Sequence, residues 1–286
     1  MNTIKSIIIL RIFVSILLIL SVSYSHAQSE NKPPGRKGNL YFYWGWNRGW
    51  YTTSDIHFHG VDYDFKLQNV VAHDKPTTFS WNKYFNPFNV TIPQTDFRIG
   101  YYIKDNYSVS FGFDHMKYVM KKNQEVKISG TIANTETLYD GTYANQAIIL
   151  APEFLQFEHT NGLNYINIDM RRFDRILDLG KVKINLTEGI GVGVLMPKTN
   201  TTLFNKNNND QYHISGYGIS AVAAVNISFF KFLFIQSEFK NGYINMPDIR
   251  TSHNQSESAS QHFFFTQFNV LFGATIGLHH KDSTAK

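Results

Sequence analysis

Residues 182–194 read VKINLTEGIGVGV, and this stretch shows the pattern that decides the fold. Apolar side chains occupy every second position, interrupted by Glu188, while the positions between them carry Lys, Asn, Thr and Gly. A period of two is that of a β-strand, whose side chains point alternately to the two faces of a sheet. We therefore expect a strand with one apolar face and one polar, glycine-rich face.

The same alternation recurs between about residues 39 and 280. Ten strands are predicted, near 40–52, 55–72, 95–103, 107–120, 149–159, 164–173, 181–196, 214–228, 232–244 and 263–279. Most exceed the five or six residues usual in a soluble sandwich, and strands of about nine or more residues can cross a bilayer. A closed sheet satisfies its own backbone polar groups in hydrocarbon. The predicted fold is all-β: a transmembrane antiparallel up-and-down β-barrel of about ten strands, with twelve as second choice and a soluble β-sandwich or lipocalin-like barrel as the alternative.

The first residues have the order of a secretory signal. Lys5 and Arg11 precede the apolar run 12–22, and Ser25-His26-Ala27 supplies small residues before Gln28. The run is shorter than the roughly 20 residues of a membrane-spanning helix. We predict a cleaved signal peptide at 1–27, a polar lead-in at 28–38, the barrel at 39–280 and a polar tail at 281–286.

Composition excludes several other classes of protein. The formal net charge is +5, Lys and Arg are scattered singly, and there is no cysteine. A nucleic-acid surface would show a clustered basic stripe, and a disulfide framework or thiolate metal site needs cysteine. We expect no nucleic-acid partner and no cofactor.

The chain resembles the small outer-membrane β-barrel proteins of Gram-negative bacteria, an uncharacterised family. The resemblance rests on YFYWGWNRGWYTTSDIHFHGVDYDF at 41–65 and FRIGYYIKDNYSVSFGFDHMKYVM at 97–120, and it covers nearly all of 39–280. It implies an outer-membrane location, contact with membrane lipid and lipopolysaccharide, recognition by the barrel assembly machinery, and a monomer, but no activity. The chain departs from many such barrels by continuing past its last strand, so recognition would use internal aromatics such as Phe268 and Phe272, or tolerate a tail.

The connections between predicted strands are of two kinds. Short turns at 104–106 and 229–231 should both be periplasmic, yet the ten-strand count separates them by an odd number of strands. Long loops at 74–94, 121–148, 198–213 and 245–262 are where binding usually occurs on a rigid barrel. Residues 79–88 carry enough aromatics to pack on the barrel or plug it. Trp44, Trp46, Trp50 and Trp81 are interpreted as an interfacial girdle with a loop anchor.

The polar faces of the predicted strands carry equal numbers of acids and bases. The acids are Asp64, Asp96, Asp114, Asp169 and Glu238, and the bases are Lys66, Arg98, Arg171, Lys183 and Lys240. In a narrow barrel such charges would pair across the lumen in a hydrogen-bonded network. A wide diffusion pore is therefore not expected.

Two weaker candidate sites involve histidine. Glu158-His159-Thr160-Asn161-Gly162 is similar in part to the His-x-Ser-Asn pattern of barrel-type phospholipases and lipid A deacylases, but position 161 is Asn rather than Ser. No hydroxyl would share the face of His159, so no catalytic residue is predicted, and Asn161-Gly162 is predicted to form a turn. Asp55, His57 and His59 lie on one face of a predicted strand, which makes them weak candidates for a divalent metal, but the pattern is not enough to predict a metal site.

These observations predict an outer-membrane barrel with a structural, surface-binding or narrow solute-transport role. We expect no covalent chemistry. The alternative is a lipid-modifying outer-membrane hydrolase acting on phospholipid or lipid A, which would require His159 to face the external leaflet beside a hydroxyl and a carboxylate.

Overall fold

The computed structural model describes residues 35–86, 93–209, 211–230 and 232–278. The predicted signal peptide at 1–27, residues 28–34 of the lead-in and the tail at 281–286 lie outside this range. The strands described below all belong to the compact unit Arg36–Lys286.

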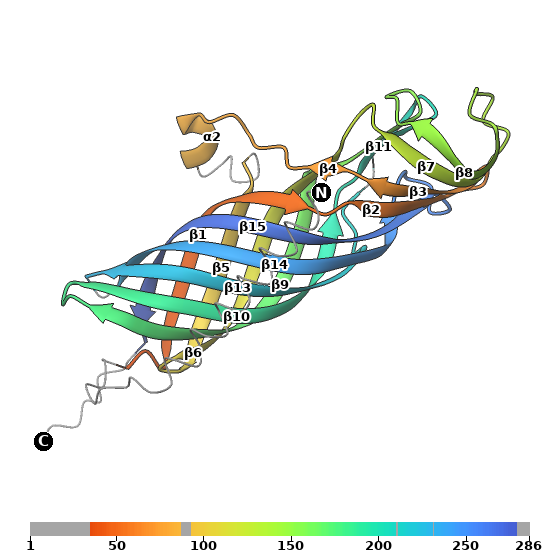
Figure 1. The fold of residues 1–286 in the computed structure, drawn as a ribbon. Helices are drawn as coiled ribbons and strands as arrows, with labels where there is room; N and C mark the ends of the chain where they lie inside the picture. The colour runs from red at the N-terminus through yellow and green to blue at the C-terminus, as the bar shows by residue number, and fades with distance from the viewer. Residues whose placement is uncertain (1–34, 87–92, 210, 231, 279–286) are drawn as a thin grey trace, which may run out of the picture. The chain divides into compact units, whose positions relative to one another are not determined.

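Eight antiparallel strands close into a barrel (Figure 1). They are β1 (Asn39–Tyr51), β5 (Thr95–Lys104), β6 (Tyr107–Met120), β9 (Leu155–Asp178), β10 (Val182–Pro197), β13 (Gly216–Phe229), β14 (Leu233–Arg250) and β15 (Ser258–Gly277). Each strand pairs with the next in this order, and β1 pairs with β15 from Asn39 opposite Gly277 to Tyr51 opposite Phe265. The predicted all-β, antiparallel barrel is confirmed.

The predicted number of barrel strands is wrong. The segment predicted as one strand at 55–72 is a hairpin outside the barrel, β2 (Ser54–His59) and β3 (Tyr63–Val70). The segments predicted as separate strands at 149–159 and 164–173 belong largely to the single strand β9. The alternation of apolar and polar residues indicates that a segment is a β-strand, but it does not indicate which strands it pairs with.

The predicted turn at Asn161-Gly162 is also wrong, because both residues lie within β9. Gly162 has a φ of +133°, and the pairing of β9 with β6 shifts register between Met116 and Tyr118. An Asn-Gly pair supplies unusual backbone angles, which a β-bulge can use as readily as a hairpin turn can. The chain bends here and continues in the same direction.

With eight strands, the turns that follow β5 and β13 fall at the same end of the barrel. The turn after β9 and the paired ends Asn39 and Gly277 lie there too. The four long connections occupy the opposite end, called the loop end below. The ten-strand prediction put an odd number of strands between the turns at 104–106 and 229–231, so the two turns could not lie at the same end. In the structure four strands separate them, and both turns lie at one end of the barrel.

A sheet extension continues from the loop end of β15. Ser258–Gln261 of β15 pair with β2, and β2 pairs with β3, β3 with β7 (Glu125–Ile132), and β7 with β8 (Gly141–Ile149). Short strands also pair with the loop-end parts of the barrel strands. The strand β4 (Ala72–His73) pairs with β6. The strand β11 (Asn200–Leu203) pairs with β9 on one side and with β12 (Lys206–Asn209) on the other. Figure 1 shows this extension beyond the barrel strands.

Within the described residues, no helix is long and apolar enough to cross a membrane.

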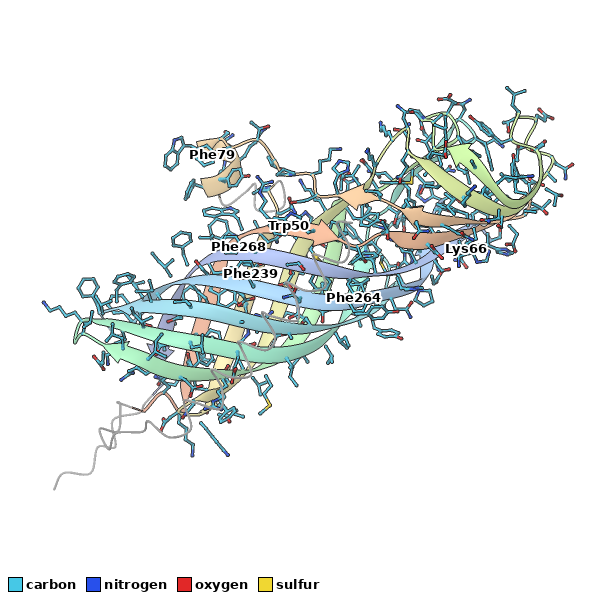
Figure 2. The ribbon with its side chains drawn as sticks, in the orientation of Figure 1. Trp50, Lys66, Phe79, Phe239, Phe264 and Phe268 are labelled. Carbon is cyan, nitrogen blue, oxygen red and sulfur yellow. The ribbon has the colours of Figure 1, made fainter. Side chains whose placement is uncertain are left out.

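The outer wall of the barrel is apolar. Exposed outward side chains include Phe42, Phe97, Ile99, Val109, Phe111, Ile168, Met170, Ile190, Val192, Ile219, Val225, Ile235, Phe239, Phe264, Phe272 and Ile276. Figure 2 shows Phe239, Phe264, Phe268 and Trp50 on the outside of the strands. A wall of this composition is costly in water and favourable against acyl chains.

A short aromatic segment of the first long connection lies outside the barrel rather than in its lumen. It includes the helix α2 (Trp81–Phe85). The Trp46 ring of β1 contacts Phe85 at 5.2 Å and Tyr84 at 5.6 Å between centroids, and it contacts Phe272 of the outer wall at 5.8 Å. The plug considered for 79–88 is thus wrong for 79–86, because these rings pack on the wall; residues 87 and 88 lie outside the described residues.

Barrel closure can be tested with engineered cysteines, since the chain has none of its own. Phe42 of β1 and Ala274 of β15 are opposite each other in the ladder, where paired Cα atoms lie within disulfide reach. The variant Phe42→Cys/Ala274→Cys should form an intramolecular disulfide on mild oxidation, visible by non-reducing electrophoresis after proteolysis. Phe42→Cys/Ile219→Cys should not, because β13 is not a neighbour of β1; cross-linking of this control alone would contradict the strand order.

Candidate functional site in the barrel interior

The barrel interior is filled in three layers along the strands. At the turn end, an aromatic layer contains Tyr41, Tyr43, Tyr102, Phe173, Phe234 and Leu271. At the loop end, a larger apolar core joins side chains of β2, β3 and β7 to those of the barrel strands. Charged side chains occupy the middle layer, and we call them the interior charge cluster: Asp96, Arg98, Asp114, Asp169, Arg171, Glu238 and Lys240.

Arg98 of β5 contacts side chains of β1, β6 and β9; the contact with β6 is Nη1 donating to Ser110 Oγ at 3.1 Å. Its Nη1 lies 3.0 Å from Asp169 Oδ2 of β9, and its Nη2 donates to Asn167 Oδ1 at 2.6 Å. Its Nε donates to the hydroxyl oxygen of Tyr43 on β1 at 2.8 Å. The Arg98 guanidinium is fully hydrogen-bonded, and the residue is 1% exposed. Arg98 therefore holds neighbouring strands together as a cross-brace.

Arg171 of β9 forms a second brace. Its Nη2 lies 2.8 Å from Asp169 Oδ2, and its Nη1 lies 2.5 Å from Glu238 Oε2 on β14. Glu238 also accepts hydrogen bonds from Gln236 Nε2 at 2.9 Å and Asn269 Nδ2 at 3.3 Å. Asp169 is shared by both arginines, so the two braces form one connected network.

Lys240 and Asp96 complete the cluster. Lys240 of β14 is paired with Asp114 of β6, which also accepts from Asn167 Nδ2 at 3.1 Å. Asp96 accepts from Asn47 Nδ2 at 2.7 Å. Because side chains from β1, β5, β6, β9, β14 and β15 meet here, the cluster ties together most of the barrel circumference.

Three of the ten residues predicted to form a lumen network lie outside this cluster. Lys183 is near the turn end, with its Nζ 3.6 Å from Asp178 Oδ2. Asp64 and Lys66 are on β3, where they point to the exposed face of the sheet extension. Their placement in the lumen was wrong because the strand that carries them is not a barrel strand.

Several members of the network were not predicted. Tyr43, Asn167, Ser110, Gln236 and Asn269 all donate or accept in it, and all stand on the polar side of the alternation. The prediction considered charge alone, although neutral groups on the inward face supply about as many of the hydrogen bonds.

The weak metal candidates are arranged differently from the prediction. His57 Nε2 lies 2.6 Å from Asp64 Oδ1 and His59 Nδ1 lies 3.3 Å from Asp64 Oδ2, while Asp55 pairs with Lys66 at 2.8 Å. The histidines thus face Asp64 rather than Asp55. In the described part of the chain, no group of three His, Asp or Glu side chains has the geometry to hold a metal ion.

The weak catalytic candidate His159 is buried in the apolar core at the loop end. Its Nδ1 is 3.0 Å from Thr199 Oγ1 and its Nε2 is 3.2 Å from the amide nitrogen of Gln261. The rings of Tyr118 and Phe157 flank it. Since the Gln261 amide donates to Nε2, Nδ1–H donates to Thr199, and the imidazole is neutral. Burial lowers the pKa of His159 to about 3.

No protein-family model and no curated protein matches this chain. Among solved structures, it is similar to the outer membrane protein OprG from Pseudomonas aeruginosa, with 10% identity over 85% of this chain and 97% of that one, and a TM-score of 0.39. It is also similar to the outer membrane protein AlkL (10% identity, 90% and 100% covered, TM-score 0.37) and to Ail, the attachment invasion locus protein of Yersinia pestis (8%, 82% and 99%, 0.30). At these TM-scores the likenesses carry no argument about function.

The class of protein follows from the barrel itself. A closed antiparallel barrel with an apolar outer wall and a polar, charged interior is the transmembrane architecture of the Gram-negative outer membrane. The protein is an outer-membrane β-barrel protein.

Removing one member of the interior charge cluster should destabilise the barrel strongly. Arg171→Ala leaves Glu238 and Asp169 partly unpaired in a dry site, which typically costs about 3 to 5 kcal/mol. Arg171→Met/Glu238→Leu removes the facing charges together and should cost clearly less. Urea unfolding in lipid vesicles, followed by the heat-modifiable gel shift, measures both. Equal stability of Arg171→Ala and the native chain would contradict the bracing role.

The buried His159 should make the loop end sensitive to acid. The folded state holds the neutral imidazole to about pH 3, whereas an unfolded chain protonates below about 6.5. The unfolded state therefore binds more protons in this interval, and the free energy of unfolding falls as pH falls, by up to about 1.4 kcal/mol per pH unit. Urea unfolding at pH 7 and pH 4.5 should show this loss, reduced in His159→Gln but unchanged in His253→Gln, an exposed histidine. The same loss in His159→Gln would assign the acid sensitivity to another group.

Proposed function

We propose that the barrel is closed to solutes and serves as an outer-membrane anchor that presents the sheet extension at the cell surface for binding. One observation carries this proposal: the long side chains of Arg98, Arg171 and Lys240 cross the interior, and each is 1% exposed or less. An eight-stranded barrel is just wide enough for its side chains to fill. A solute path would have to break these ion pairs.

The apolar core supports the same proposal. It lies on the loop-end side of the charge cluster and includes the buried side chains of Phe58, Phe65, Phe157 and Phe263. An ion that passed the charge cluster would next meet a packed hydrocarbon layer, where an unpaired charge is very costly. Narrow solute transport is therefore less well supported than surface binding.

The sheet extension supplies the binding part. One face of β2 and β3 packs on the apolar core, while the opposite face exposes His57, His59, Asp64 and Lys66. The strand β8 pairs with β7, its sequence GTYANQAII has no charged residue, and most of it is exposed. An uncharged strand at a sheet edge can accept an extended polypeptide by β-augmentation.

The position of His159 argues against the lipid-modifying hydrolase. The imidazole is covered by Tyr118 and Phe157 and is turned toward the apolar core, away from acyl chains. The pairing of β1 with β15 leaves the barrel strands no open edge inside the membrane for a second copy, and we propose that the protein works as a monomer whose β8 edge is left for a different polypeptide.

Bilayer recording and surface labelling test the proposal together. The native chain in a planar bilayer should give no discrete conductance steps. Steps that change in Glu238→Gln or Arg98→Gln would overturn the closed barrel.

The orientation is tested by epitope insertion on intact cells. An epitope placed between Ala133 and Asp140, in the β7–β8 connection, should bind antibody without permeabilisation. The same epitope at Gly180, in the turn after β9, should bind only after permeabilisation. The reverse result would place the extension in the periplasm.

A further inference from the structure

The interior charge cluster contains one more acid than base. The lumen network predicted from the sequence had equal numbers of both, but the structure places Asp64, Lys66 and Lys183 elsewhere. Four acids and three bases remain, and each of the seven residues is 2% exposed or less. A buried carboxylate without a compensating charge is very costly, so the cluster needs one further positive charge.

Asp96 is the acid that is left without a base. The three bases of the cluster are engaged with the other three acids, in the ion pairs described above. Asp96 Oδ1 accepts a hydrogen bond from Asn47 Nδ2 at 2.7 Å, and among the described residues its Oδ2 has no hydrogen-bond partner. One neutral amide donor does not balance a full negative charge in a dry site. The missing positive charge therefore belongs at Asp96.

A second carboxylate lies directly opposite this one. Asp96 of β5 and Asp114 of β6 are partners in the ladder, and side chains at such positions have Cβ atoms about 4.5 to 5.5 Å apart. Two carboxylates at this spacing repel each other when both are ionised, and one proton removes the repulsion. Because Asp114 already pairs with Lys240, the proton belongs on Asp96.

The neutral polar groups near the pair are short of donors. On β15, Gln267 is opposite Lys240, and Asn269 is opposite Asn47, which donates to Asp96. Three buried oxygen atoms in this group have no hydrogen-bond partner within the described ranges, Asp96 Oδ2, Gln267 Oε1 and Asn269 Oδ1, against one such nitrogen, Gln267 Nε2. Buried oxygen atoms are normally satisfied by a donor. A proton on Asp96 turns an acceptor into the donor that the group lacks.

The other charged groups around Asp96 do not supply the missing charge. Asp114 of β6 and Glu238 of β14 repel a negative charge on Asp96, and Lys240 of β14 attracts it but is already paired. Arg98, on the same strand as Asp96, lies against a carboxylate of β9. The facing side chains of β1 and β15 are neutral. Bases at the turn end pair with a carboxylate of β9 there.

We propose that the Asp96–Asp114 pair is a proton-binding site inside the barrel. At neutral pH one proton resides on Asp96, so a carboxylic acid and a carboxylate face each other across β5 and β6. The proton is the small cation that balances the interior charge cluster. It also links the stability of the barrel to pH, since the folded barrel holds a proton that an unfolded aspartate releases above about pH 4. The site is independent of what the sheet extension binds.

The variant Asp96→Asn replaces the acid by a neutral side chain of the same shape. Folding of the native chain takes up one proton where the unfolded aspartate is ionised, so the stability that this proton provides is lost as the pH rises. The native unfolding equilibrium constant, divided by that of Asp96→Asn, should rise about tenfold per pH unit between about pH 5.5 and 7.5. Urea unfolding in lipid vesicles, followed by the heat-modifiable gel shift, gives this ratio.

A ratio that does not change with pH would overturn the proposal, because Asp96 would then be ionised in the folded and unfolded states alike. The matched control is Asp62→Asn, an exposed aspartate between β2 and β3. The corresponding ratio for this control should stay constant over the same range.

Infrared spectroscopy of the folded barrel detects the proton itself. At pH 7 the native chain should show the carbonyl stretch of a protonated carboxylic acid, and Asp96→Asn should lack it. Absence of this band from the native chain, or its persistence in Asp96→Asn, would overturn the site.

A metal cation at the same place is distinguished by ion replacement. Exchange of Na⁺ for N-methylglucamine at constant ionic strength should leave the stability of the native barrel unchanged. A loss of stability in the native chain that is absent from Asp96→Asn would assign the site to Na⁺ and overturn the proton.

Discussion

Backbone N–H and C=O groups inside a bilayer have to find partners within the protein, and the pairing of β1 with β15 is what meets this requirement here. Without it, two long edges would stand unpaired in hydrocarbon. The ladder runs over the whole of β1, from Asn39 to Tyr51. Closure in turn divides every strand into an outward side and an inward side, and both the apolar wall and the packed interior depend on that division.

The interior then has to be filled by the side chains that closure encloses. An eight-stranded barrel leaves little room, and the chain meets this limit with an aromatic layer, a charged layer and an apolar core in series. The charged layer is stable because Asp169 is shared by Arg98 and Arg171, so that neither guanidinium is buried without a carboxylate. The same side chains that brace the strands also fill the barrel interior, so stability and a filled lumen have one physical origin.

Strands longer than the bilayer requires carry the fold beyond the membrane. The loop-end parts of β9 and β15 pair with β11 and β2, and they supply Phe157 and Phe263 to the apolar core at the loop end. The sheet extension is thus continuous with the barrel wall rather than tethered by a flexible linker. A surface held in this way loses little conformational entropy when it binds a partner.

The sequence by itself determined the fold class and much of the interior. The period of two identified the strands and their apolar side, and the inward positions of Arg98, Asp114, Asp169, Arg171, Glu238 and Lys240 follow from that alternation alone. It could not place Asp64 and Lys66, since the alternation in 55–72 is the same whether a strand joins the barrel or an extension outside it. It also could not distinguish the bulge at Gly162 from a turn, because the backbone angles suit both.

Tertiary structure decided the number of barrel strands, the burial of His159 and the packing of the α2 segment on the outer wall. All three features depend on contacts between residues far apart in the chain. A local pattern of side chains does not show which distant strand completes each hydrogen-bond ladder.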